Sequence, residues 1–241
     1  MQPSQPAETP AETLPDLRFE RRPDGVAVIT LALPERRNMM SEAMTASWAQ
    51  LMQRLREDRA LRALVVTGEG PAFCSGGDLS WIGAEPDASV DDLRARMRAF
   101  YSTWLSVLEV EVPTIAAING PAVGAGLAVA LACDLRYAAD DALLGMPFTS
   151  LGMHPGMAST WLLPSVAGLA VARELLLTGR MVTGEEAQQL GLVNRAVPAA
   201  QVLEVALDAA AAAAAAAPVA TRLTTRALRH GGHPSFEAAL E

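Results

Sequence analysis

Two glycine-rich turns hold the residues whose types and spacing could do chemistry. Residues 72–79 read Ala-Phe-Cys-Ser-Gly-Gly-Asp-Leu and follow a strand-like run, and residues 119–126 read Asn-Gly-Pro-Ala-Val-Gly-Ala-Gly and follow another. Paired glycines permit close backbone approach to a ligand. Two such turns can aim backbone N–H groups at one point, an arrangement that stabilises an oxyanion such as that of a thioester. The second turn also feeds an apolar run at 127–132, interpreted as a helix whose N-terminal amides favour negative charge.

Three side chains near these turns could move a proton or attack a substrate. His154 is held extended by Pro155; its imidazole could act near neutral pH or simply hydrogen-bond the backbone, and the sequence leaves both interpretations open. Asp78 follows the first turn, where we favour a cap for a helix beginning near Leu79 over a catalytic acid. Cys74 has no histidine nearby in sequence and is interpreted as a small buried residue rather than a nucleophile.

Alternating strands and helices must position these turns. Apolar runs typical of strands recur at 25–33, 63–66, 114–118, 135–138 and 193–197. Between and beyond them, Ser or Thr caps predict helices over about 41–58, 89–110 and 184–190, and Gly191 supplies the last of these with a stop. The alternation through the first 140 residues predicts an α/β fold.

The two ends of the chain differ from this alternating middle. Residues 1–16 are rich in Pro, Glu, Thr and Ala, and we expect a disordered tail there. The core is expected over 17–197 and a C-terminal helical module over 198–241. That module contains nine consecutive alanines, 209–217, followed by Pro218 at the start of a helix over 219–229. The alanine run has little bulk to bury, so we expect it to pack closely against a neighbouring surface.

Composition narrows the classes of function. The net charge is −8, and all nineteen basic residues are arginine, so no lysine can form a Schiff base. An acidic chain without a basic stripe argues against nucleic acid as a partner. No apolar run of membrane-spanning length is free of both charge and glycine. The two cysteines lack metal spacing and fit reduced thiols, which with the lack of a signal peptide predicts a cytoplasmic protein with no metal site.

Five segments together carry a resemblance to a known family. They are 33–38 (Leu-Pro-Glu-Arg-Arg-Asn), 72–79, 119–126, 133–136 (Cys-Asp-Leu-Arg) and 187–194. In this order and spacing, from about Leu17 to Arg229, the chain resembles the crotonase superfamily of enoyl-CoA hydratases and isomerases. The resemblance implies a ClpP-like spiral of strand–strand–helix turns and a C-terminal helical module, here shorter than usual. It also implies a homotrimer or dimer of trimers.

The resemblance further implies a coenzyme A thioester as ligand and assigns residues to it. The thioester oxygen would receive N–H groups of Gly77 and Ala125. Coenzyme A, as part of the substrate and not a tightly bound cofactor, would meet the segments that contain Arg36, Arg37, Ala72, Ser75, Gly76 and Leu79. By the resemblance, Ala128 and Phe148 stand where the family has two catalytic glutamates. Ala128, Phe148 and Trp161 are the candidates to line the acyl pocket.

Because neither alanine nor phenylalanine transfers a proton, we expect ordinary hydratase activity to be weak or absent. The expected function is therefore polarisation of an acyl-CoA thioester, with His154, or less readily Asp78, as acid or base. Isomerisation, C–C cleavage and thioester hydrolysis all pass through an oxyanion and remain open. The alternative is a non-catalytic acyl-CoA-binding protein, and a weaker one is a structural subunit that assembles with an active relative.

Overall fold

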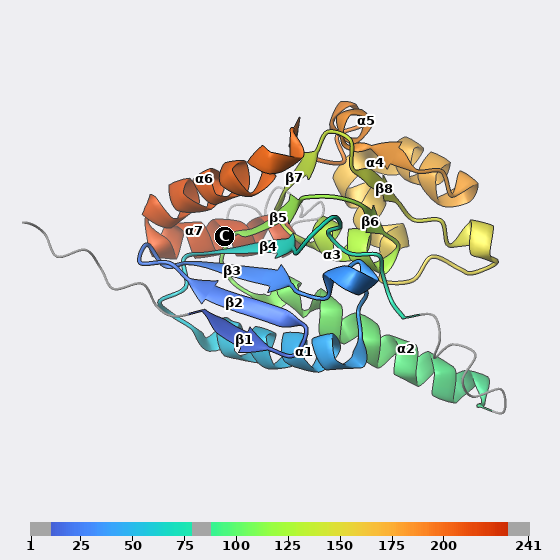
Figure 1. Ribbon diagram of the computed structural model, residues 1–241, viewed down its shortest axis with the longest axis horizontal. Helices are drawn as coiled ribbons and strands as arrows, with labels where there is room; N and C mark the ends of the chain where they lie inside the picture. Colours follow the sequence, from blue (N-terminus) through green and yellow to red (C-terminus); the bar gives the residue numbers. More distant parts are fainter. Residues whose placement is uncertain (1–10, 79–87, 231–241) are drawn as a thin grey trace, which may run out of the picture.

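The computed structural model describes residues 11–78 and 88–230 and shows a mixed α/β molecule built around one large sheet (Figure 1). The sheet has the strand order β1-β2-β3-β4-β5-β7-β10. Its strands are β1 (Glu12–Leu14), β2 (Leu17–Arg21), β3 (Val26–Leu31), β4 (Ala63–Gly68), β5 (Thr114–Ile118), β7 (Leu135–Ala139) and β10 (Arg195–Val197). All pairs from β3 to β10 are parallel, whereas β1, β2 and β3 pair antiparallel. The α/β class predicted from the sequence is confirmed.

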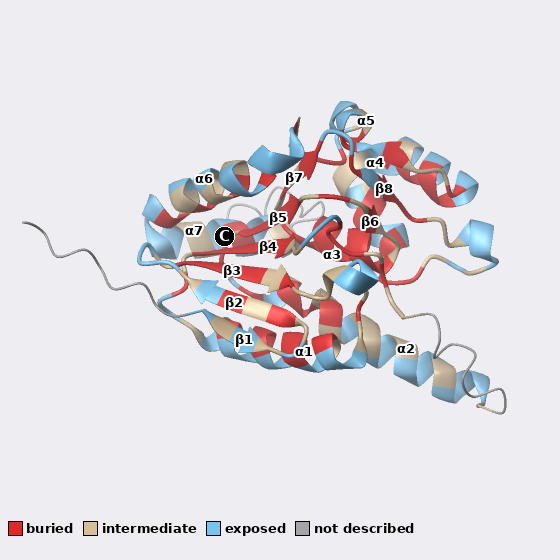
Figure 2. Ribbon diagram, viewed as in Figure 1, coloured by how far each residue is buried: buried red, intermediate tan, exposed pale blue. Residues whose placement is uncertain are grey.

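Helices cover both faces of this sheet. They are α1 (Glu42–Glu57), α2 (Val90–Leu105), α3 (Ala125–Ala132), α4 (Ser159–Thr178), α5 (Gly184–Gln189), α6 (Val202–Ala215) and α7 (Pro218–His230), with short 3-10 turns at Pro34–Arg36, Ser106–Glu109, Thr149–Leu151 and Ala199–Gln201. A smaller sheet joins β6 (Ala122–Val123), β8 (Leu143–Gly145) and β9 (Val182–Thr183) in the order β6-β8-β9. Figure 2 shows that the central strands are buried, while α2 is exposed over most of its length.

The predicted helix starts are formed as the sequence indicated. The Ser41 hydroxyl accepts a hydrogen bond from the Met44 N–H at 2.9 Å, and the Thr183 hydroxyl accepts one from Glu186 at 3.2 Å. The Ser89 hydroxyl likewise accepts from the Asp92 N–H at 3.1 Å. The helix after Ser89 ends earlier than expected, because the chain tightens into a 3-10 turn from Ser106 before it reaches Val110.

The C-terminal alanine run packs against the sheet. Buried residues of α6 recur at a spacing of four: Val202, Ala206, Ala210 and Ala214. They form one stripe, and α6 contacts β4, β5 and β7. The small side chains let the helix lie close to the strands. Arg229 of α7 links that helix to the core. Its guanidinium forms an ion pair with Asp134 at 2.5 Å and donates hydrogen bonds to the backbone oxygens of Leu108, Val110 and Val112.

The expected disordered tail over residues 1–16 is wrong at its C-terminal end. Residues 12–14 form β1, whose register places Glu12 opposite Phe19 of β2. The Glu12 carboxylate also receives two hydrogen bonds of 2.8 Å from Arg54 of α1. These bonds and the strand pairing order a segment whose composition alone suggests disorder. Residues 1–10 lie outside the described residues.

Within residues 11–78 and 88–230, one helix has the length and hydropathy that a membrane-spanning segment would need. The α4 helix has a mean hydropathy of 1.3 over its most apolar window, and the pair α6 and α7 passes the same test only across a bend of 117°. Gly168 interrupts α4 with φ 79° and ψ 162°, and Pro164 lies one turn earlier. The apolar side chains Trp161, Leu169 and Leu177 of α4 are exposed.

Candidate active site

The two glycine-rich turns lie directly against one another. Cys74 and Ala122 pair as in parallel strands. The Cys74 N–H donates to the Pro121 oxygen at 3.2 Å, and the Val123 N–H donates to the Cys74 oxygen at 3.0 Å. The ends of β4 and β5, neighbours in the parallel sheet, deliver the two turns to the same edge. The sequence-predicted site residues Gly77 and Ala125 therefore belong to one locus.

The two turns can approach one another closely because several of their residues are glycine. A Cβ atom on Gly126 would lie 2.3 Å from the Cys74 carbonyl oxygen, and one on Gly76 would lie 2.9 Å from the Val123 oxygen and 3.5 Å from the Ala125 nitrogen. Gly76 also has φ +99°, a conformation that residues with a Cβ rarely adopt. The first turn and the start of α3 can pack backbone to backbone only because these positions are glycine.

The amides of Gly77 and Ala125 are available for a ligand. Within residues 11–78 and 88–230, neither N–H donates a hydrogen bond to another residue. Ala125 is the first residue of α3, so its amide is one of those that a helix leaves without an internal partner. Gly77 is half-buried. It forms a parallel β-bridge with Met40, in which the Met40 N–H donates to the Gly76 oxygen at 2.9 Å. Both residues line the same cavity.

That cavity has a volume of about 120 Å³ and a mostly apolar wall. The two turns form one side, α2 forms a second, and the segment 147–157 forms a third. The lining residues are Ser75, Gly76, Gly77, Asp78, Met97, Phe100, Tyr101, Val123, Gly124, Ala125, Pro147, Phe148, Leu151, Met153, His154 and Met157. Such a wall suits the hydrocarbon part of a ligand, with the two amides as the polar contact.

Three titratable side chains border the cavity. His154 lines it and is exposed on its outer side. Asp78 is engaged by Arg36, whose Nη2 lies 3.3 Å from a carboxylate oxygen. Asp78 was expected to cap a helix starting near Leu79, and that position lies outside the described residues. Tyr101, which the sequence analysis did not single out, contributes a phenol from α2, and burial raises the pKa of that phenol.

The two positions that the resemblance implies to replace catalytic glutamates differ in their surroundings. Phe148 lines the cavity, and its ring lies 3.5 Å from the place where a Cβ of Gly124 would be. Ala128 is completely buried within α3 and does not contact the cavity. Trp161 is 54% exposed on α4 and likewise does not line the cavity. Of the three residues predicted for an acyl pocket, the structure brings only Phe148 to it.

The segment with Arg36 and Arg37 is fixed to the first turn by Asn38. The buried Asn38 amide nitrogen donates to the Ala72 oxygen at 2.7 Å and to the Glu69 oxygen at 2.9 Å, and its oxygen accepts from the Leu33 N–H at 2.9 Å. The Ser75 N–H donates to the Arg37 oxygen at 3.0 Å. Both guanidinium-bearing residues are exposed beside the cavity-lining turn.

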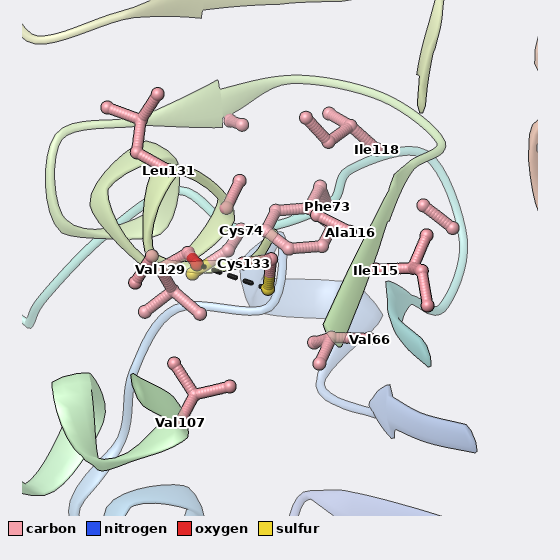
Figure 3. Close-up of a cluster of buried hydrophobic side chains, with 14 of the residues drawn as sticks. Val66, Phe73, Cys74, Val107, Ile115, Ala116, Ile118, Val129, Leu131 and Cys133 are labelled. Carbon is pink, nitrogen blue, oxygen red and sulfur yellow. Dashed lines mark hydrogen bonds between the residues drawn. The ribbon is translucent and has the colours of Figure 1, made fainter. Parts of the chain in front are cut away.

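The two thiols are packed in the core and are not nucleophiles. Figure 3 shows Cys74 and Cys133 among the apolar side chains of Phe73, Ile118 and Val129. Both are buried, and desolvation raises the pKa of each to about 12. A thiol with such a pKa stays protonated near neutral pH. The interpretation of Cys74 as a small buried residue agrees with this environment.

Two residues on the far side of the cavity have strained backbone conformations. Met157 and Ala158 both have positive φ, 54° and 52°, although neither is glycine. Met157 lines the cavity and Ala158 precedes the first turn of α4. A non-glycine residue in this left-handed conformation costs roughly 1–3 kcal/mol of conformational free energy, and such residues tend to cluster at functional sites.

Comparison with known proteins assigns this arrangement to a family. The enoyl-CoA hydratase/isomerase family profile matches residues 21–241. The probable enoyl-CoA hydratase EchA14 of Mycobacterium tuberculosis is 40% identical over 214 residues, which cover 88% of this chain and 82% of that protein. The 1,2-epoxyphenylacetyl-CoA isomerase of Escherichia coli is 37% identical over 174 residues, 72% of this chain and 66% of the relative.

A solved structure agrees with the sequence matches. The crystal structure of a putative enoyl-CoA hydratase from Streptomyces coelicolor superposes with a TM-score of 0.87 and 34% identity, covering 100% of this chain and 88% of that one. The profile match alone spans well over half of the sequence. The chain therefore belongs to the enoyl-CoA hydratase/isomerase family, within the crotonase superfamily that its turns resemble.

Proposed function

We propose that this protein binds an acyl-CoA thioester, polarises its carbonyl between the N–H groups of Gly77 and Ala125, and isomerises the acyl group. The observation that carries the proposal is the contact between the two turns, which gathers two amides without protein partners at one apolar cavity. An amide donor of this kind is typically worth about 3–4 kcal/mol to a transition state with oxyanion character.

The side chains present favour isomerisation over hydration. Hydration needs one group to activate water and another to protonate the α-carbon, whereas a single group can take a proton from one carbon of the chain and return it to another. Among the described residues that line the cavity, His154 alone carries an imidazole, and Asp78 is paired with Arg36. The thioester enolate formed between the two proton transfers would place its negative charge on the oxygen that the amides hold.

Coenzyme A would approach from the side of Arg36 and Arg37. Their guanidinium groups are exposed next to the turn that carries Gly77, and they match the chemistry of phosphate. The name of the Escherichia coli relative, an acyl-CoA isomerase, is in keeping with the proposal. A non-catalytic acyl-CoA binder is the second candidate, because His154 is exposed rather than enclosed.

The test is a panel of saturated, 2-enoyl and 3-enoyl thioesters of coenzyme A, with products followed by mass spectrometry and chromatography. We expect double-bond migration, and its loss in His154→Ala with thioester affinity retained. Binding without turnover of any thioester would support the binder, and turnover to a hydrated, cleaved or hydrolysed product would refute isomerisation. No binding of any thioester would refute both functions.

The oxyanion site can be tested separately by removing one N–H. Proline is tolerated at the first position of a helix, so Ala125→Pro removes the amide hydrogen while retaining a residue suited to the start of α3. We expect turnover to fall roughly 10²–10³-fold. Glu42→Pro, the same change at the first position of α1, is the matched control and should leave turnover unchanged.

A further inference from the structure

Tyr101 contributes a phenol side chain to the mostly apolar wall of the cavity. Its side chain extends from α2, and a Cβ on Gly156 would lie 2.2 Å from the phenol oxygen. The hydroxyl therefore occupies space that any side chain at position 156 would need. Its ring is held from the other side by an edge contact with Phe100, with centroids 6.1 Å apart.

The hydroxyl has no hydrogen-bond partner in the part of the chain that the structure describes, residues 11–78 and 88–230. The residues that line the cavity with it are largely hydrocarbon and thioether groups such as Met97 and Met153, and Gly156 lies against the phenol oxygen. A hydroxyl facing such a wall loses free energy unless water or a ligand atom pairs with it. Burial raises the pKa of the phenol, so the group stays a neutral hydrogen-bond donor.

The position of Tyr101 relative to the two amides sets where a ligand atom would lie. The residue that lies against Gly77 is Phe100, and not Tyr101. Two ring carbons of Phe100 lie 3.6 Å and 3.7 Å from the position that a Cβ atom on Gly77 would occupy. The phenol oxygen lies instead against Gly156, two residues beyond His154. The hydroxyl is thus displaced from the thioester end of the cavity, toward the part that would receive the distal carbons of the acyl group.

We propose that Tyr101 is a specificity-determining residue that donates a hydrogen bond to an oxygen atom on the distal part of the acyl group. This inference rests on the proposed thioester site and adds the substrate class. The preferred acyl group carries a hydroxyl or carbonyl oxygen several carbons beyond the thioester, in addition to the thioester carbonyl. A purely hydrocarbon chain would offer the phenol no hydrogen-bond partner.

The test measures affinity by calorimetry for pentanoyl-CoA and hexanoyl-CoA against 5-hydroxypentanoyl-CoA and 6-hydroxyhexanoyl-CoA. We expect the wild-type chain to bind one of the hydroxylated thioesters roughly 3- to 10-fold more tightly than its hydrocarbon counterpart, the factor for one neutral hydrogen bond. Tyr101→Phe should abolish this preference by weakening only the hydroxylated ligand. Tyr137→Phe changes the chain's other tyrosine, on β7 and outside the cavity lining, and should preserve the preference.

Three outcomes would overturn the inference. Equal affinities for both members of each pair in the wild-type chain would show that no distal oxygen is recognised, while the thioester site itself would stand. A Tyr101→Phe variant that weakens both members equally would show that the ring acts by packing alone. Absence of binding for all four thioesters would refute the proposed thioester site together with this inference.

Discussion

Replacing Gly126 by alanine should separate the two glycine-rich turns. Gly126 is the second residue of α3, and its Cα lies over the peptide of Cys74 in the first turn. The added Cβ would lie 2.3 Å from the Cys74 oxygen and 2.8 Å from its Cβ. The Cys74 oxygen cannot rotate away, because it accepts the Val123 N–H at 3.0 Å.

The size of the effect follows from this overlap. Nonbonded heavy atoms lie roughly 3.5 Å apart or more, so one backbone segment must move by roughly 1 Å. Overpacking of this kind costs about 1–3 kcal/mol, and the higher helix propensity of alanine returns about 1 kcal/mol. We therefore expect a loss of about 0–2 kcal/mol in the free energy of unfolding. A displacement of about 1 Å between catalytic groups can lower turnover about 10²-fold, so activity should fall much further than stability.

The assay compares urea unfolding, thioester affinity and turnover of Gly126→Ala with those of Gly184→Ala. Gly184 is the first residue of α5, and a Cβ there would lie 1.9 Å from the Ala139 oxygen, so the control creates a similar backbone overlap away from the cavity. It should reduce stability with unchanged turnover per folded molecule. Unchanged turnover in Gly126→Ala, or equal losses in both variants, would refute the reasoning.

Three further predictions concern stability and reactivity. Arg229→Met should lower the free energy of unfolding by about 3 kcal/mol in urea, because the Asp134 carboxylate loses its cationic partner and keeps only the donors of Thr114. The carbonyls of Leu108 and Val110 also lose their guanidinium donor. Arg229→Lys should recover less than half of this loss, since an ammonium cannot reproduce the forked geometry of the guanidinium. Asn38→Ala should cost about 3 kcal/mol from three lost hydrogen bonds of about 1 kcal/mol each, and a loss below 1 kcal/mol would contradict this role. Because burial raises the pKa of Cys74 and Cys133 to about 12, whereas an unfolded thiol ionises near about 8.5, the free energy of unfolding should fall as pH rises above about 8.5. At pH 8 the native thiols should resist a thiol reagent until urea exposes them, and rapid labelling of native protein would contradict their burial.

Features set by local sequence were predictable. Strand β5 spans the predicted residues 114–118 because an uninterrupted apolar run between a proline and a glycine-rich turn leaves little freedom. The caps at Ser41 and Thr183 are likewise local, since a side chain bonds an amide three residues on. The two turns were recognisable because glycine is required where backbones touch.

Features that depend on contacts distant in sequence were not predictable. Strand β1 has three residues and no clear alternation, and it is ordered by β2 and by Arg54 of α1. Tyr101 looks like an ordinary packing residue of an amphipathic helix until the fold places its hydroxyl against Gly156, 55 residues later. Trp161 was predicted for the pocket, but its helix turns the ring to the exterior.

The backbone origin of the proposed oxyanion donors has a consequence for how such a site can change. Every residue except proline carries an amide N–H, so no ordinary single substitution at Gly77 or Ala125 deletes the hydrogen-bond donor itself. The groups that transfer protons or recognise the acyl chain are side chains, and one codon change replaces them. The part of the site that binds the carbonyl oxygen is thus robust to mutation, while the side chains that transfer protons or recognise the acyl chain are free to diverge. Proteins with this fold can therefore acquire a different reaction while they still bind the thioester.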